Sequence, residues 1–170
     1  MKTDKLQVGY LKTNCYFITE GNDLIIVDPG DDYEQIKAKI GSNNLRAIFL
    51  THRHPDHIGA LEQLLSDYEV PINPNKFSGF NYQIIPTPGH AEDSVTFYFP
   101  DEKVMFTGDF LFYQTIGRTD FPGGSKQDMI KSLETIKKYD DNITIYPGHG
   151  SETVLKNEKS RFNKYLNSLL

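Results

Sequence analysis

Every histidine of this chain lies in one of three short motifs, and each motif comes at or just after a strand-like apolar segment. The first is Thr51-His52-Arg53-His54-Pro55-Asp56-His57, directly after the apolar run 45–50. The other two are Thr87-Pro88-Gly89-His90 and Tyr146-Pro147-Gly148-His149-Gly150. No histidine occurs elsewhere among the 170 residues, so this distribution predicts a metal centre on one rim of a sheet structure.

The first motif is expected to occupy a turn at the carboxyl end of a strand, because Pro55 disfavours a helical backbone at the residue before it. In an extended segment, residues two apart point the same way. His52 and His54 are therefore expected to bind one ion together. Asp56 and His57 then face a second ion nearby, although Asp56 alone also suits the N-cap of a following helix.

Three further candidates each follow a glycine, which lets the backbone approach a crowded site closely. They are His90, His149 and the carboxylate Asp109 of Thr107-Gly108-Asp109. Taken singly, these residues also suit turns or the surface. Histidine nitrogen and carboxylate oxygen suit zinc, with iron or manganese as alternatives. Seven ligands are enough for two divalent ions if one carboxylate bridges them, and two ions about 3.5–4 Å apart form a hydrolytic centre.

The length of 170 residues predicts one domain, 1–170. The order of apolar segments predicts an α/β fold in which helices cover two sheets. Strands are expected at 6–11, 15–19, 24–27, 45–50, 70–73, 83–85, 94–99, 103–106 and 143–146. Helices are expected at 33–40, 57–68, 125–136 and 152–170, with Ser125 as an N-cap and a loop at 110–124.

Composition limits the function. A net charge of −5 and a pI near 5.5 argue against a general nucleic-acid binder. No apolar run approaches the roughly 20 residues that span a bilayer, and the first residues resemble neither a signal nor a transit peptide. The single cysteine, Cys15, cannot form an internal disulfide, which favours the cytoplasm; its apolar neighbours predict a buried strand position.

Together the motifs resemble the metallo-β-lactamase superfamily, and within it the single-domain glyoxalase II-like hydrolases. The resemblance runs nearly from end to end and is carried by Thr13-Asn14-Cys15-Tyr16, Val27-Asp28-Pro29-Gly30, the histidine motifs, Thr107-Gly108-Asp109 and Ile116-Gly117-Arg118-Thr119-Asp120-Phe121-Pro122-Gly123-Gly124. It implies a four-layer αβ/βα sandwich with metals at one sheet edge.

The resemblance also implies two ligand sets joined by a bridging carboxylate, Asp109. The first ion takes three histidines, which are His52, His54 and His90. The second takes Asp56, His57 and His149. Asp56 and Asp109 are, in addition, the predicted catalytic residues. Asp28 matches a family aspartate near the site and equally suits a turn that ends a strand.

The implied activity is hydrolysis of a small thioester, of the hydroxyacyl-thiol kind, by a metal-bridging hydroxide. Two-domain glyoxalase II enzymes hold glutathione with a helical C-terminal domain and a Lys-x-Tyr segment. This chain ends about twenty residues after His149, and Arg118-Thr119-Asp120 replaces Lys-x-Tyr. Arg118 is a candidate for binding a substrate carboxylate, or it pairs with Asp120 to hold the loop. The thiol carrier and the oligomeric state stay open.

Two other functions are compatible with the motifs. Persulfide oxygenation at one iron would use His52, His90 and Asp109, and such relatives carry the same Gly-Arg-Thr-Asp segment. A metal-binding module without catalysis is the other, although a complete ligand set argues against it. A nuclease fits the acidic charge poorly, and an exported β-lactamase would normally carry a signal peptide.

Overall fold

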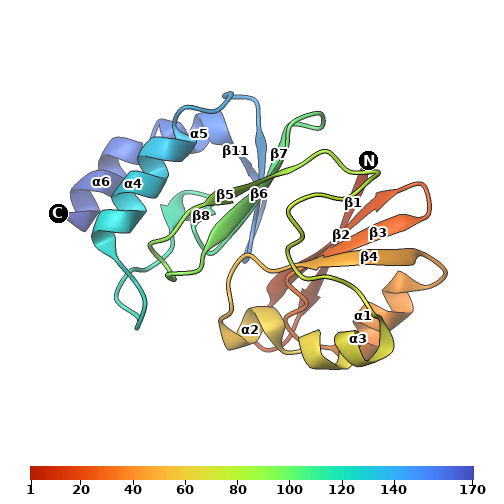
Figure 1. The fold of residues 1–170 in the computed structure, drawn as a ribbon. Helices are drawn as coiled ribbons and strands as arrows, with labels where there is room; N and C mark the ends of the chain where they lie inside the picture. Colours follow the sequence, from red (N-terminus) through yellow and green to blue (C-terminus); the bar gives the residue numbers. More distant parts are fainter. The chain divides into compact units, whose positions relative to one another are not determined.

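The structure, a computed structural model, describes all residues from 1 to 170. The chain divides into two compact units, Met1–Asn81 and Tyr82–Leu170. Each unit has its own sheet and its own helices (Figure 1). The organisation as one domain, expected from length, stays a prediction.

The first unit contains a four-stranded sheet of order β1-β2-β3-β4. The strands are β1 (Lys2–Val8), β2 (Thr13–Glu20), β3 (Asp23–Val27) and β4 (Asn44–Phe49). β1, β2 and β3 pair antiparallel, whereas β3 and β4 are parallel. Because parallel strands end at the same sheet edge, the residues that follow β3 and β4 are neighbours. Asp28 N–H accordingly donates to Phe49 O at 2.9 Å.

Helices α1 (Tyr33–Ile40), α2 (Pro55–Ile58) and α3 (Leu61–Asp67) belong to the same unit. α1 and α3 cover one face of its sheet (Figure 1). Ile36 and Ile40 from α1 and Leu64 from α3 are buried with strand residues such as Ile26 and Ile48. Burying each of these side chains contributes about 1.5–3 kcal/mol, so the predicted spacing of Ile36 and Ile40 is the basis of the helix.

The single helix predicted at 57–68 is wrong, because Gly59 and Ala60 separate α2 from α3. Gly59 N–H donates to Gly30 O at 2.9 Å, and Ala60 N–H donates to Pro29 O at 3.0 Å. These donors are bound to another loop, so they do not continue the helical ladder. The helix is interrupted by these tertiary hydrogen bonds, which the apolar periodicity of the sequence cannot predict.

Two predicted strands of this unit also differ from the structure. The strand expected at 6–11 starts earlier and ends at Val8, because Gly9 and Lys12 adopt φ values of 67° and 53° in the turn to β2. The strand expected at 70–73 is reduced to one isolated bridge between Ile48 and Ile72.

The second unit contains a five-stranded sheet of order β11-β10-β7-β6-β5. Its strands are β5 (Gln83–Pro86), β6 (Val95–Phe99), β7 (Val104–Gly108), β10 (Thr144–Pro147) and β11 (Thr153–Val154). β6 is antiparallel to both β5 and β7, and β10 is parallel to β7. The strands β5, β7 and β10 therefore all end at one edge, which is where His90, Asp109 and His149 follow.

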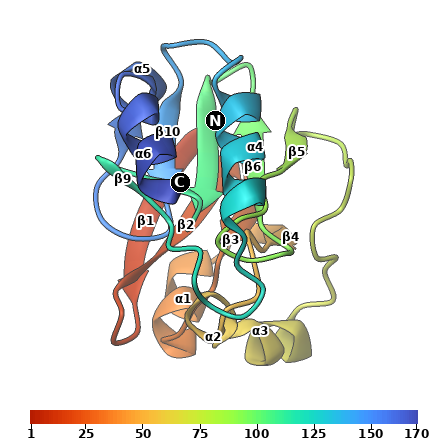
Figure 2. The same ribbon diagram turned by 90° about the vertical axis from the view of Figure 1, so that its left-hand side faces the viewer.

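Helices α4 (Lys126–Ile136), α5 (Leu155–Lys159) and α6 (Phe162–Leu169) complete this unit. α4 and α6 lie in contact on one face of the sheet (Figure 2). Met129, Leu133 and Phe162 of these helices share a buried cluster with Met105 and Ile145 of the strands. Ser125 is the N-cap of α4, as predicted, and its hydroxyl accepts from Asp128 N–H at 3.2 Å.

Two expectations for this unit are wrong. The segment 110–124, expected to be a loop, contains the hairpin β8 (Leu111–Phe112) and β9 (Thr115–Ile116). The helix expected at 152–170 begins instead as β11, where Thr153 pairs with Ile145, and it is interrupted between α5 and α6. Two-residue strands are too short to show a periodic pattern.

Glu158 of α5 is fully buried and ties three elements together. Its carboxylate accepts from Gln114 N–H (3.1 Å), the Thr153 hydroxyl (2.8 Å) and the Tyr165 hydroxyl (2.7 Å). Burial and the bond to this carboxylate raise the pKa of Tyr165. Glu158 thus links the turn of the β8–β9 hairpin to β11 and α6.

Replacing Glu158 with glutamine is expected to lower the free energy of unfolding by roughly 2–4 kcal/mol. The NH₂ group of glutamine cannot accept a hydrogen bond, so at least one donor that bonds to the carboxylate loses its acceptor. Urea denaturation measures this change. Glu134→Gln, at an exposed position on α4, is the matched control and should leave the midpoint within experimental error. An E158Q midpoint equal to that of the control would contradict the role of this network.

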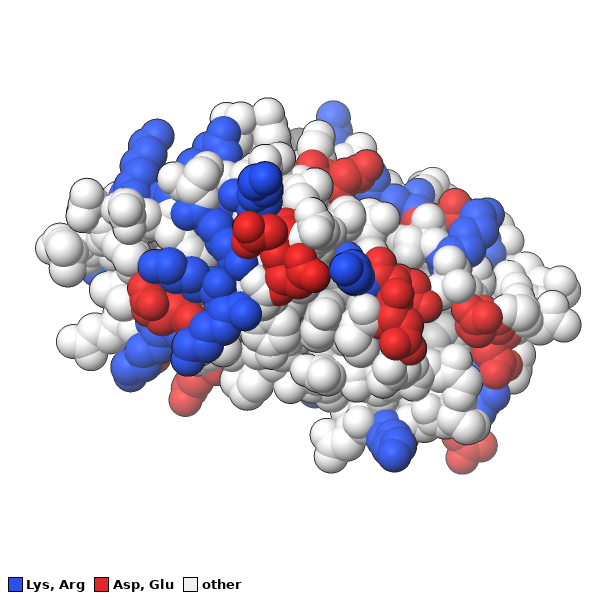
Figure 3. All heavy atoms as spheres, turned by 90° about the horizontal axis from the view of Figure 1, so that it is seen from above, with Lys and Arg blue, Asp and Glu red and all other residues white.

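Three further features concern the helices, the surface charge and the single thiol. None of the helices has the length and apolar character that a bilayer crossing requires. Lys and Arg side chains gather over the helices of the second unit, interspersed with acidic ones (Figure 3). Lys159 pairs with Asp141 at 2.7 Å, so part of this charge is balanced locally. Cys15 is buried, as predicted, and burial raises the pKa of its thiol.

Candidate metal centre

Within the first unit, His52 and His54 follow β4 and point toward one another. His52 Nε2 lies 3.1 Å from His54 Nδ1. Two nitrogens that bind one zinc ion tetrahedrally at 2.0–2.1 Å are about 3.3 Å apart. The pair therefore fits one shared cation. His54 is extended, with φ −65° and ψ 146°, as the proline after it predicts.

Asp56 and His57 lie in the single turn of α2. His57 Nε2 is 3.4 Å from Asp56 Oδ2. The hydroxyl of Thr13, at the start of β2, donates to the same carboxylate oxygen at 3.0 Å. This bond between residues 43 positions apart gives the Thr13-Asn14-Cys15-Tyr16 motif a role in orienting Asp56.

Asp28 ends β3 with a φ of 52° and is almost fully buried. Its carboxylate accepts from Thr51 N–H at 2.8 Å and from the Thr51 hydroxyl at 2.6 Å, and it lies 2.9 Å from His57 Nδ1. His57 Nδ1 thus donates to Asp28, which directs Nε2 to the Asp56 side. Asp28 is both a turn residue and an orienting group.

Thr51 orients a second imidazole. Because its hydroxyl donates to Asp28, the same oxygen accepts from His52 Nδ1 at 3.1 Å. That tautomer leaves His52 Nε2 as the ligating nitrogen, on the side of His54. In the sequence, only its place before the first histidine distinguishes Thr51 from other threonines.

The Val27-Asp28-Pro29-Gly30 motif also requires its glycine. A Cβ on Gly30 would lie 1.9 Å from Asp56 O, and a Cβ on Gly59 would lie 2.2 Å from Gly30 O. Only glycine permits this approach of the two backbones. The turn after β3 therefore determines how closely α2, which carries Asp56 and His57, packs against this turn.

Within the second unit, Asp109 lies between two imidazoles. Its Oδ2 is 3.6 Å from His90 Nε2 and 3.5 Å from His149 Nε2. All three residues follow strands that end at the same sheet edge, as the strand directions require. One oxygen between two imidazole nitrogens is the arrangement that a carboxylate shared by two cations needs.

The segment Ile116-Gly117-Arg118 packs directly against this group. His90 Nδ1 donates to Arg118 O at 2.9 Å, so that Nε2 faces Asp109. A Cβ on Gly117 would lie 1.8 Å from Asp109 O and 3.0 Å from His90 Cβ. The glycine was visible in the sequence as part of a motif, but its contact with the ligand candidates was not.

Gly117→Ala is expected to lower divalent-metal affinity by about tenfold or more, because the methyl group displaces the Asp109 backbone and the ligands beside it. Competition with a chromogenic chelator measures the affinity. Gly21→Ala is the control, since Gly21 lies in the β2–β3 turn at φ 60° and its Cβ would meet no atom within 4 Å. Equal affinities for G117A and the control would contradict the packing argument.

The Arg118 side chain is engaged within its own loop. Nε and Nη2 donate to the two carboxylate oxygens of Asp120, each at 2.7 Å. The guanidinium carbon lies 3.9 Å from the centroid of the Phe121 ring. This geometry is that of the loop-holding pair considered above, and the binding of a substrate carboxylate by Arg118 stays a prediction.

The ion pair with Arg118 lowers the pKa of Asp120 to about 2, from an ordinary value of 3.8. A depressed pKa stabilises the folded loop above about pH 4, and this contribution is lost as the pH falls toward 2. NMR titration of the Asp120 carboxyl should give a midpoint near 2. A midpoint at the ordinary value would show that the pair does not form in solution.

The sequence matches the model of the metallo-beta-lactamase superfamily over residues 8–76 and 73–149. Hydroxyacylglutathione hydrolase GloC from Haemophilus influenzae is 33% identical, with 99% of each chain covered. The BLEG-1 B3 metallo-beta-lactamase is 26% identical, with a TM-score of 0.89 over 94% of this chain and 97% of that one. TTHA1623, solved in a di-iron-bound form, is 27% identical, with a TM-score of 0.84 over 91% and 96%. These likenesses confirm the predicted αβ/βα fold class.

Proposed function

The chain belongs to the metallo-beta-lactamase superfamily, whose members are generally metal-dependent hydrolases, and on that premise we propose that it hydrolyses thioesters. The observation that carries the proposal is the Asp109 carboxylate between His90 and His149. The likeness to a hydroxyacylglutathione hydrolase supports the thioester class.

We propose that the seven candidate ligands hold two divalent ions. The first set comprises His52, His54 and His90, the second comprises Asp56, His57 and His149, and Asp109 belongs to both. The donor set fits, because imidazoles and carboxylates suit zinc, iron and manganese. Bound ions of this kind supply a water whose pKa falls toward about 7 and an electrophile for a carbonyl oxygen.

In this reaction a bond forms between water oxygen and the thioester carbonyl carbon and the carbon–sulfur bond breaks. The products are a carboxylate, a thiol that takes one proton of the water, and one released proton. We propose that the carboxylates of Asp109 and Asp56 orient the water and take part in the transfer of its proton. Thr13 holds the Asp56 carboxylate by its hydroxyl. A thiolate is a stable leaving group, so the reaction needs no separate acid. This agrees with the proposed site, in which all five histidines are candidate metal ligands and none is left to act as an acid.

The proposed partner is a small-molecule thioester, without nucleic acid or membrane, and the proposed compartment is the cytoplasm. The buried free thiol of Cys15 is consistent with a reducing compartment.

Thiol release from a panel of glutathione and coenzyme A thioesters tests the proposal. Protein loaded with zinc, iron or manganese should release thiol, and chelated protein should not. His54→Ala is the matched inactive variant. Oxygen uptake with glutathione persulfide, together with one iron per chain and no thiol release, would instead support the persulfide dioxygenase alternative.

A further inference from the structure

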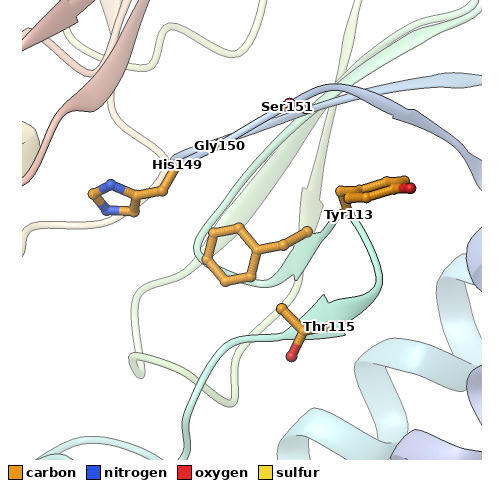
Figure 4. Close-up of a pocket in the computed structure, with 6 residues that line it drawn as sticks. Tyr113, Thr115, His149, Gly150 and Ser151 are labelled. Carbon is orange, nitrogen blue, oxygen red and sulfur yellow. The ribbon is translucent and has the colours of Figure 1, made fainter.

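Beside His149, the second unit has an open cavity of about 370 Å³. Its walls come from two segments (Figure 4). Phe112, Tyr113 and Thr115 belong to the β8–β9 hairpin, while Gly150 and Ser151 follow His149 after β10. Nothing in the proposed chemistry so far uses this space.

The lining is apolar in character. None of the six lining residues is Lys, Arg, Asp or Glu. The Tyr113 side chain is large and 52% exposed, and the Phe112 ring lies with its centroid 6.3 Å from that of His149. An aromatic surface therefore runs outward from a candidate metal ligand. Such a surface binds hydrocarbon and does not compensate the lost hydration of a charged group.

We infer that this cavity binds the apolar acyl tail of a thioester whose carbonyl group lies on the His149 side. The inference rests on the proposed function and narrows its substrate class to acyl groups with an alkyl or aryl tail. We assign the acyl group of the thioester, and not its thiol part, to the cavity. Thiol carriers such as glutathione and coenzyme A have carboxylates or phosphates, and the lining has no Lys or Arg to bind them. A cavity of about 150 Å³ holds benzene, so the space admits a phenyl ring or a medium-length alkyl chain.

A hydrogen bond to Glu158 holds the β8–β9 hairpin, which forms one wall of the cavity. Gln114, between Tyr113 and Thr115, donates its backbone N–H to the buried Glu158 carboxylate at 3.1 Å. This bond ties the tip of the hairpin to β11 and α6 through the network described above. The cavity is thus preorganised, and binding need not order its wall.

The first test is a chain-length series with one thiol, from acetyl to octanoyl coenzyme A, on the metal-loaded full chain. Each methylene that leaves water for the cavity should raise kcat/KM by about fourfold at most. We expect the octanoyl to acetyl ratio of kcat/KM to be tenfold or more. A ratio within twofold of one, with thiol release intact, would overturn the inference and leave the proposed function standing.

Substitutions in the cavity test whether it is the source of the chain-length preference. Thr115→Phe places a ring in the cavity, and Tyr113→Ala removes one wall. Both should lower the octanoyl to acetyl ratio by about tenfold, since the ratio depends on the tail that the cavity holds. Thr135→Phe, on α4, is the matched control and should keep the wild-type ratio. An unchanged ratio in T115F and Y113A would reject this cavity as the subsite.

A binding measurement decides the case in which no thioester is turned over. Octanoate titrated into ¹⁵N-labelled protein should shift the amide signals of Gly150 and Ser151, which line the cavity, and T115F should abolish these shifts. Shifts at the two amides without any turnover would support the apolar site while refuting the thioesterase. Their absence in the wild type would overturn the inference by itself.

Discussion

Alanine at position 109 is expected to abolish turnover, with kcat/KM falling roughly a thousandfold or more, and to leave at most one metal ion per chain. Asp109 places one carboxylate oxygen 3.6 Å from His90 Nε2 and 3.5 Å from His149 Nε2, so its removal takes away the group that both proposed ligand sets share. Elemental analysis of the purified variant and thiol release from a thioester measure the two effects.

Asp101→Ala is the matched control, because Asp101 is exposed in the turn between β6 and β7. It should retain wild-type metal content and turnover. If D109A kept two ions and measurable hydrolysis, the bridging role of this carboxylate would be wrong.

Alanine at position 28 is expected to have the next largest effect, although Asp28 is not a proposed ligand. Metal affinity should fall by about 10- to 100-fold, since the partner that orients His57 is lost. The free energy of unfolding should fall by roughly 3 kcal/mol, because the buried donors of Thr51 and His57 lose their acceptor. Chelator competition and urea denaturation measure the two quantities.

Asp28→Asn separates orientation from folding. Its amide oxygen still accepts from Thr51 N–H, whereas its NH₂ faces His57 Nδ1 and the Thr51 hydroxyl. D28N should therefore lose metal affinity with a smaller loss of stability than D28A. Wild-type metal affinity in both variants would show that Asp28 only ends the strand.

Local patterns predicted those helices whose buried side chains repeat with the helical period and whose ends carry a recognisable capping residue. The helix Tyr33–Ile40 follows from two isoleucines four residues apart, and α4 follows from Ser125 and a 3.6-residue period. The break at Gly59 and the hairpin after Asp109 were missed. The first depends on a hydrogen bond to Gly30, and the strands of the second have two residues each.

The histidine candidates were visible in the sequence because all five lie in three short motifs and none occurs elsewhere in the chain. The groups that orient them were not. Thr13, Thr51 and the carbonyl group of Arg118 each make one hydrogen bond to a ligand candidate, namely Asp56, His52 and His90. A threonine or a backbone carbonyl at such a place has no distinguishing pattern, so only coordinates reveal its role.

The most direct test of the proposed centre is the metal content of the full chain after reconstitution with excess zinc, iron or manganese and removal of unbound ions. We expect two ions per wild-type chain. His54→Ala from the first unit and His149→Ala from the second should each hold fewer. A wild-type chain that binds one ion or none at saturation, or an H149A chain that still binds two, would contradict the account.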